Sequence, residues 1–186
     1  MNLYERFAGA HPYEAFLENY GTPPQRDRWR AVRGEVKLTD PQKELLKGFK
    51  RELNVLVLAG VWCGDCSSQC PIFESFAEIA PVIRVKYIDR DEHAEVQKLL
   101  QINGGNRVPV ALFFSEDGSE VARYGDRTLS RYRQLVHDQV GESCSTGLAI
   151  GSDPLFVKVT QDWLDQFERA QWILRLSPRL RQKHKD

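Results

Sequence analysis

The chain has 186 residues, of which 41% are hydrophobic and 28% charged, so we expect a packed globular protein rather than a disordered one. Its 26 Lys and Arg balance 26 Asp and Glu, which leaves no overall positive field and disfavours nucleic acid as a partner. No apolar run approaches the roughly 20 residues that span a bilayer, and the first residues lack the pattern of a secretory signal. We therefore expect a cytoplasmic protein without a membrane partner.

Residues 1–38 predict a helical extension that is broken in the middle. Pro12 stands at a first helical position, apolar side chains follow at helical spacing, and Gly21 ends the run. Thr22-Pro23-Pro24 predicts a stiff break, after which the residues around Trp29 indicate another short helix.

Residues 39–141 alternate between helical and strand patterns. Thr39 or Asp40 caps a helix whose apolar stripe is expected to reach Leu53. The next run, Val55 to Ala59, is continuously apolar and predicts a strand buried on both faces. Further strands are expected at 82–88, 110–114 and 120–124, and helices with their apolar positions at 72–80, 96–100 and 129–140, the last being a core helix. A parallel pair followed by an antiparallel edge predicts an α/β fold with a mixed sheet.

Residues 142–186 predict a linker, a long helix and a basic tail. The segment 142–152 is rich in Gly and Ser, and a helix begins at Asp153-Pro154. Its apolar positions form one seam, which Trp172, Ile173 and Leu176 widen, so this C-terminal helix is a candidate homodimer surface. The basic residues that follow are more typical of a solvated helix end than of a nucleic-acid site.

Four cysteines are too few for a disulfide framework, and their spacing is more informative than their number. Cys63, Cys66 and Cys70 cluster, whereas Cys144 stands alone. In a reducing compartment a close pair is typically catalytic or metal-binding. Between a buried strand and a helix start, the helix N–H groups and dipole favour a Cys63 thiolate, which can attack a disulfide. Cys66, one turn later, can attack the mixed disulfide and release the reduced product.

The motif Trp62-Cys63-Gly64-Asp65-Cys66 resembles the Trp-Cys-Gly-Pro-Cys active site of the thioredoxin superfamily. Pro71 falls where thioredoxins kink the active-site helix, and Val108-Pro109 resembles their pair of a hydrophobic residue and a cis-proline. Gly125 resembles the glycine after their last strand. A narrower resemblance is to bacterial thioredoxin-like proteins with Trp-Cys-Gly-Asp-Cys and three further motifs, here Arg90-Asp91, Asn103-Gly104-Gly105 and Gly125-Asp126-Arg127.

The resemblance covers about residues 40–140 and implies a thioredoxin-like mixed sheet flanked by helices. We therefore expect a thioredoxin-like domain at 39–141, between an N-terminal helical extension at 1–38 and a C-terminal linker, helix and basic tail at 142–186. The implied catalytic residues are Cys63 and Cys66. The implied substrate-binding residues are Trp62, Val108, Pro109 and Gly125, with Gly64, Asp65, Arg107 and Arg127 as supporting residues.

Two departures from the thioredoxin pattern concern proton transfer. Val57 replaces the buried Asp six residues before the first Cys, and its frequent lysine partner aligns with Val85. Asp65 replaces the proline of the motif. Its carboxylate is either a base for Cys66 or simply an acid favoured in a first helical turn. Its charge is also expected to raise the pKa of Cys63.

Other residues near the motif have alternative interpretations. Arg107 and Arg127 either steady the Cys63 thiolate by their charge or are solvated loop residues. Cys70 is either a core residue or a thiol that accepts a disulfide from Cys66 or carries glutathione. A metal site would combine the three clustered cysteines with Cys144, His93 or His137. Because structural zinc usually draws on two close pairs, we expect no metal.

The leading prediction is a thiol–disulfide oxidoreductase, acting as a cytoplasmic protein-disulfide reductase through the Cys63 and Cys66 dithiol. No bound cofactor is required, because the two thiols carry the chemistry. The expected partners are a disulfide-containing protein or a small-thiol substrate, and a separate reductase or thiol as the electron donor. The alternative is a thioredoxin-like binding or scaffold module whose dithiol is regulatory or idle.

Overall fold

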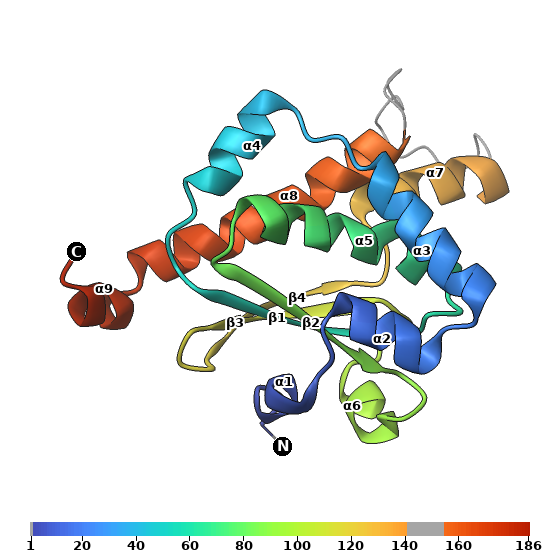
Figure 1. Ribbon diagram of the computed structural model, residues 1–186, viewed down its shortest axis with the longest axis horizontal. Helices are drawn as coiled ribbons and strands as arrows, with labels where there is room; N and C mark the ends of the chain where they lie inside the picture. The colour runs from blue at the N-terminus through green and yellow to red at the C-terminus, as the bar shows by residue number, and fades with distance from the viewer. Residues whose placement is uncertain (1, 141–154) are drawn as a thin grey trace.

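The computed structural model describes residues 2–140 and 155–186, and the fold is built on a mixed sheet of four strands (Figure 1). The strand order is β2-β1-β3-β4, with β1 and β2 parallel and the other neighbours antiparallel. The strands are β1 (Leu53–Ala59), β2 (Ile83–Asp89), β3 (Val110–Ser115) and β4 (Glu120–Gly125). The predicted α/β class and mixed sheet are confirmed.

Helices connect and cover these strands in the described residues. They are α1 (Glu5–Gly9), α2 (Tyr13–Tyr20), α3 (Pro23–Glu35), α4 (Asp40–Lys47), α5 (Gly64–Ile79), α6 (Ala94–Leu99), α7 (Leu129–Val140), α8 (Leu155–Leu176) and α9 (Pro178–His184). Figure 1 shows α5 and α8 side by side on one face of the sheet, with α1 and α6 on the other face. The described helices include none that is both long and apolar enough to cross a membrane.

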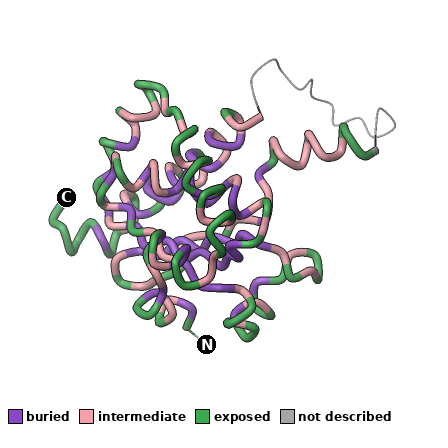
Figure 2. Tube along the Cα trace, turned by 45° about the vertical axis from the view of Figure 1, so that its right-hand side comes forward, coloured by how far each residue is buried: buried purple, intermediate pink, exposed green. Residues whose placement is uncertain are grey.

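Strand β1 is buried along its whole length, as its apolar run predicts. It lies between β2 and β3, so both of its edges are paired and both of its faces are covered. Its last residue, Ala59, leads directly into the turn that carries the cysteines. Figure 2 shows the buried residues gathered at the centre of the molecule around this sheet.

The N-terminal helices α2 and α3 are part of the core. The side chains of Phe16 and Trp29 are fully buried, and both rings contact Tyr87 of β2. The predicted break between two helices is present at Gly21 and Thr22, but Pro23 and Pro24 do not belong to it: Pro23 begins α3, with Thr22 as its N-cap. Pro tolerates a first helical turn because that turn has no intrahelical N–H bond to lose.

Two other helix predictions differ from the structure. Helix α4 is capped by Thr39 as expected, but it ends at Lys47, so Leu53 belongs to β1. Helix α7 is not a core helix, since none of its described side chains is fully buried. The reason is that α8 packs against β4 and α5, and α7 packs on α8.

The apolar seam of α8 faces its own sheet. The Trp163 ring lies 4.5 Å from Phe73 of α5 and 5.0 Å from Tyr124 of β4, centroid to centroid. Phe167 contacts Phe113 of β3 at 5.1 Å. The outer residues stay exposed: Trp172, Ile173 and Leu176. The predicted linker, its Asp153-Pro154 cap and Cys144 lie outside the described residues.

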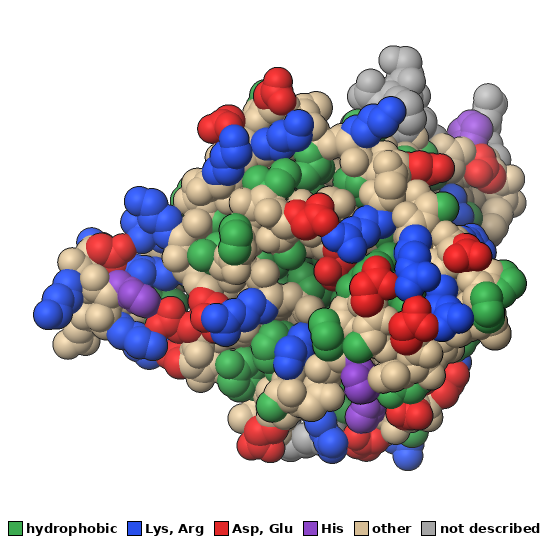
Figure 3. Space-filling model, in the orientation of Figure 1, with side chains coloured by type: hydrophobic (Ala, Val, Ile, Leu, Met, Phe, Trp, Pro, Cys, Tyr) green, Lys and Arg blue, Asp and Glu red, His purple; other side chains and the backbone are tan. Residues whose placement is uncertain are grey.

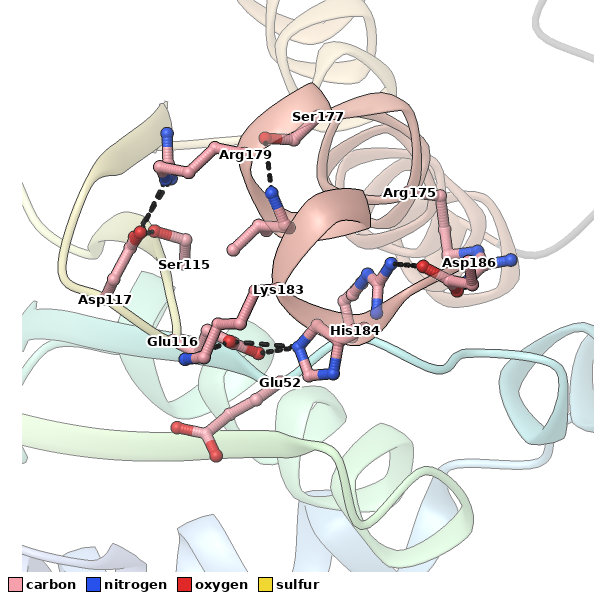
Figure 4. A network of polar contacts seen from close by, with 12 residues as sticks. Glu52, Ser115, Glu116, Asp117, Arg175, Ser177, Arg179, Lys183, His184 and Asp186 are labelled. Carbon is pink, nitrogen blue, oxygen red and sulfur yellow. Dashed lines mark hydrogen bonds and ion pairs between the residues drawn. The ribbon is translucent and has the colours of Figure 1, made fainter.

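The basic tail is a docked helix, α9, and not a solvated end. Leu180 is fully buried, and Glu116 in the turn between β3 and β4 forms an ion pair with Lys183 at 2.5 Å and a hydrogen bond with His184 at 2.9 Å (Figure 4). Arg179 pairs with Asp117 of the same turn at 2.6 Å. On the face shown in Figure 3, acidic and basic side chains are interspersed over this end of the molecule.

Candidate functional site

Cys63 is the N-cap of α5, at the point where the chain leaves β1 and turns into a helix. Its backbone N–H donates to Gly60 O at 3.0 Å, which closes the turn, and its carbonyl accepts from Ser67 at 2.9 Å. The Cys63 side chain is partly exposed. The backbone N–H groups of Asp65 and Cys66 point at its sulfur and stabilise the thiolate.

Three cysteines lie at the start of α5, one of them partly exposed and two buried. Cys66 and Cys70 are fully buried, and the Cys66 thiol interacts with the side chains of both Cys63 and Cys70. The hydrogen bond with Cys66 and burial raise the pKa of the Cys63 thiol, against the effect of the backbone N–H groups. Burial raises the pKa of Cys66 as well. The Cys63 thiol is thus accessible to a substrate, whereas the Cys66 thiol is buried.

The loop before β3 lies opposite this turn. The Val108–Pro109 peptide is cis, as the sequence predicts. The Cys63 thiol donates to the Val108 carbonyl, with 3.7 Å between sulfur and oxygen. Gly125 of β4 pairs with Val110, and a Cβ at position 125 would lie only 2.4 Å from Pro109 O. Gly125 therefore has to be a glycine for β4 to approach the proline so closely.

Asp65 forms an ion pair with Arg127, at 2.7 Å between Oδ2 and Nη2. Arg107 does not reach Asp65, and it pairs instead with the buried Asp126 at 3.3 Å. Burial opposes ionisation of Asp126, but hydrogen bonds from Tyr132, its own N–H and Arg107 outweigh it and lower its pKa. Since Arg127 balances the charge of Asp65, the raised pKa of Cys63 comes from its sulfur hydrogen bond and burial rather than from Asp65.

Trp62 is 46% exposed beside the dithiol, so its apolar surface is available there. A Cβ on Gly60 would lie 2.7 Å from the indole, so the absent side chain makes room for the ring. The guanidinium of Arg90 lies 4.3 Å from the ring centroid, a cation–π contact. Arg90 belongs to the Arg90-Asp91 motif noted above, but its contact with Trp62 joins two loops that are distant in the sequence, and no local pattern reveals it.

Gln69 ties the active-site helix to the C-terminal helix, and sequence reasoning missed it. Its amide donates to the carbonyls of Asp65 and Asp126, at 3.2 and 3.1 Å. Its oxygen accepts from the Trp163 indole of α8 at 3.0 Å. With only 2% of its surface exposed, Gln69 fixes the spacing between α5, α8 and the loop after β4.

A half-buried acid, Glu74, was also missed. Val57 is fully buried, and because it stands where the thioredoxin pattern has a buried Asp, β1 carries no carboxylate at that position. On the other side of the cysteines, Tyr87 donates to Glu74 at 2.8 Å and to the Cys70 carbonyl at 3.2 Å. Burial raises the pKa of Glu74 to about 7. Glu74 lies four residues after Cys70, so the two side chains are neighbours on one face of α5. This spacing is the sequence signal that links Glu74 to the cysteines.

The described residues include no group of three or more His, Cys, Asp or Glu side chains placed to hold a metal ion. Cys144, one of the ligands considered above, lies outside them. What the arrangement offers chemically is a dithiol. An accessible sulfur sits at a helix N-terminus, with a second sulfur in contact behind it.

A thioredoxin family model matches residues 10–138. A Pseudomonas aeruginosa protein of unknown function has a similar structure, with a TM-score of 0.67 and 18% identity over 88% of this chain and 95% of that one. An HIV epitope scaffold gives a TM-score of 0.61 and 17% identity, over 90% and 91%. These two likenesses concern the fold. A search of curated proteins finds no match. Because the family match spans the sheet, the C-x-x-C turn and the cis-proline loop, this chain belongs to the thioredoxin family.

Proposed function

We propose that the protein is a thiol–disulfide oxidoreductase that reduces disulfides with Cys63 and Cys66. The observation that carries the proposal is the pairing of a partly exposed Cys63 at the start of α5 with a buried Cys66 whose sulfur is in contact with it. One sulfur is open to a substrate, and the other is reserved for the second step. The Trp62–Cys66 motif also leads us to place it with the thioredoxin-like proteins that carry Trp-Cys-Gly-Asp-Cys.

The reaction transfers two electrons from the dithiol to the substrate disulfide. Cys63 loses its proton and attacks one substrate sulfur, which forms a mixed disulfide and releases the other sulfur as a thiolate. Cys66 then loses its proton and attacks the Cys63 sulfur, which releases the second thiolate and leaves a Cys63–Cys66 disulfide. The two protons end on the two product thiols. A separate reductase or a small thiol returns the protein to the dithiol form.

Substrate docking is proposed at the surface formed by Trp62, Val108, Pro109 and Gly125. The exposed indole offers an apolar contact, and the cis-proline loop faces the Cys63 sulfur through the Val108 carbonyl. An extended substrate segment could pair with this backbone as an added strand does. The cytoplasm is the proposed location, because a reductase works where thiols are kept reduced.

Cys66 sits behind Cys63, so replacing it should freeze the first intermediate. With Cys66→Ser, we expect partner proteins to accumulate as mixed disulfides on Cys63, detected by non-reducing electrophoresis and mass spectrometry. The matched control is Cys63→Ser/Cys66→Ser, which has the same buried serine and no nucleophile. Equal capture by the two variants would overturn the assignment of Cys63 as nucleophile.

The alternative is a binding or scaffold module with a regulatory or idle dithiol. Turnover separates the two: the wild type should reduce insulin disulfides at the expense of dithiothreitol, and Cys63→Ser should lower this to the background rate. Cys70→Ser is the control, since it alters a buried thiol outside the C-x-x-C pair. If the wild type reduces insulin no faster than Cys63→Ser does, the binding or scaffold module is the better interpretation.

A further inference from the structure

A pocket of about 550 Å³ opens beside the start of α5, next to the turn that carries Cys63. Its walls come from α3, α5, the loop after β4, α7 and the first turns of α8. Residues of the C-x-x-C motif, Gly64 and Asp65, line one side. Leu155, Phe156 and Val159 of α8 make an apolar wall. Its size is that of a site for a small organic molecule.

Three arginines line this pocket: Arg28, Arg127 and Arg131. Among the described residues that line the pocket, Asp65 is the one acid, and it is paired with Arg127. Arg127 also pairs with Asp126, which is outside this lining, at 3.6 Å. Within the part of the chain that the structure describes, neither Arg28 nor Arg131 forms an ion pair, and Asp138 attracts Arg131 only at longer range. The lining therefore carries an excess of two positive charges.

Arg28 brings one of these charges to the motif itself. Its Nη2 lies 3.7 Å from the position that a Cβ would take on Gly64, the residue next to Cys63. Arg127 also lines the pocket, and its buried Nε has no hydrogen-bond partner in 2–140 or 155–186. The N-terminal end of α5 adds the positive end of its dipole. All of these features favour a negatively charged ligand, and arginine suits carboxylates because its N–H groups match them in pairs.

We propose that this pocket binds the carboxylates of a small organic disulfide and so presents its sulfurs to Cys63. The inference rests on the proposed function and names its substrate class. In the reaction, Cys63 forms a mixed disulfide with the half of the substrate held in the pocket and releases the other half as a thiol. Cys66 then displaces the bound half as a second thiol. The resulting Cys63–Cys66 disulfide is reduced by an external dithiol.

Paired substrates of different charge test the proposal. Oxidised glutathione is the anionic probe and bis(2-hydroxyethyl) disulfide the neutral one, both assayed with excess dithiothreitol and corrected for its direct reaction. The wild type should prefer the anionic probe in kcat/KM. Arg28→Gln and Arg131→Gln should each lower that preference about tenfold, as expected for one lost contact to a charged group. Arg133→Gln is the matched control: it removes the same charge from α7 but does not line the pocket.

A binding measurement separates this proposal from the proposed function. S-methylglutathione carries the carboxylates but no disulfide, so calorimetry with the Cys63→Ser/Cys66→Ser variant requires no chemistry. We expect binding that weakens about tenfold with Arg28→Gln or Arg131→Gln added, and that weakens with salt. Absence of binding, or binding unaffected by both substitutions, overturns the pocket assignment even if insulin is reduced. Binding with no turnover of either disulfide would instead support the pocket and overturn the reductase.

Discussion

The two ends of the chain are attached to the same sheet in electrostatically opposite ways. Beside the N-terminal helices, Glu74 is enclosed with Tyr87, and burial raises its pKa to about 7. At the C-terminal end, Glu116 and Asp117 face the basic side chains of α9, and these contacts lower the pKa of both acids. Ionisation of Glu74 thus weakens the fold, whereas ionisation of Glu116 and Asp117 strengthens it. Apolar packing secures the first attachment, and ion pairs help secure the second.

The largest expected effect comes from breaking the apolar attachment. Trp29→Ala removes a fully buried indole that also donates to Val61 O at 2.9 Å. We expect a loss of about 3–5 kcal/mol in the free energy of unfolding, measured by urea denaturation. Trp172→Ala, at a site 46% exposed, is the matched control and should cost far less. Equal losses for the two variants would mean that α3 is not part of the cooperative core.

Glu74→Gln should sharpen the comparison through pH. The folded protein holds the Glu74 proton up to about pH 7, whereas the unfolded chain releases it near the ordinary glutamate pKa of 4.5. The wild type should therefore lose stability as pH rises from about 4.5 to 7, on the order of 3 kcal/mol. The variant lacks this loss, so its free energy of unfolding relative to the wild type should be higher at pH 8 than at pH 4.5 in parallel urea titrations. A constant difference between the two across this range would contradict the raised pKa.

A smaller effect is expected where α8 meets α5. Trp163→Phe keeps most of the ring packing but removes the indole donor to Gln69, whose oxygen is then buried and unpaired. We expect a cost of about 1–2 kcal/mol in thermal or urea unfolding. In Trp172→Phe the lost indole bond is to an exposed acid, Glu168, so little should change. Similar costs in both variants would show that the buried hydrogen bond to Gln69 contributes no more to stability than the exposed one to Glu168.

The smallest effect belongs to α9. Because the folded pKa of Glu116 is depressed, its contribution is present above the unfolded value near 4.5 and is lost as pH falls through the folded value. Glu116→Gln should cost about 0.5–1 kcal/mol at pH 7 and low salt, since its partners are largely exposed. The cost should shrink in 1 M salt and below pH 4. A cost that stays the same under these conditions would point to packing instead.

Local signals in the sequence were sufficient for the sheet and for the dithiol. Val55 to Ala59 is apolar enough to predict a buried strand, and Pro109 follows a hydrophobic residue at the spacing expected of a cis-proline. Tertiary pairings were not predictable in the same way. The periodicity of α8 identified its apolar face, but not that β4 and α5 would cover it.

The charged partners at the site show the same limit. Asp65 was expected to act on the cysteines, yet its partner is Arg127, brought near by the loop after β4. Arg28 lies far from Cys63 in the sequence and reaches Gly64 only because α3 packs on α5. A side chain's residue type tells what it can pair with, and the folded chain decides which pair forms.

The position of Trp62 has a spectroscopic consequence. Of the four tryptophans, Trp29 and Trp163 are buried in helices and Trp172 lies on the outer face of α8, whereas Trp62 adjoins Cys63. A disulfide quenches the fluorescence of a neighbouring indole, so emission from Trp62 should rise when the Cys63–Cys66 pair is reduced. The protein thereby contains its own optical probe of its redox state, and stopped-flow mixing with a substrate can follow the formation of the Cys63–Cys66 disulfide without an added dye.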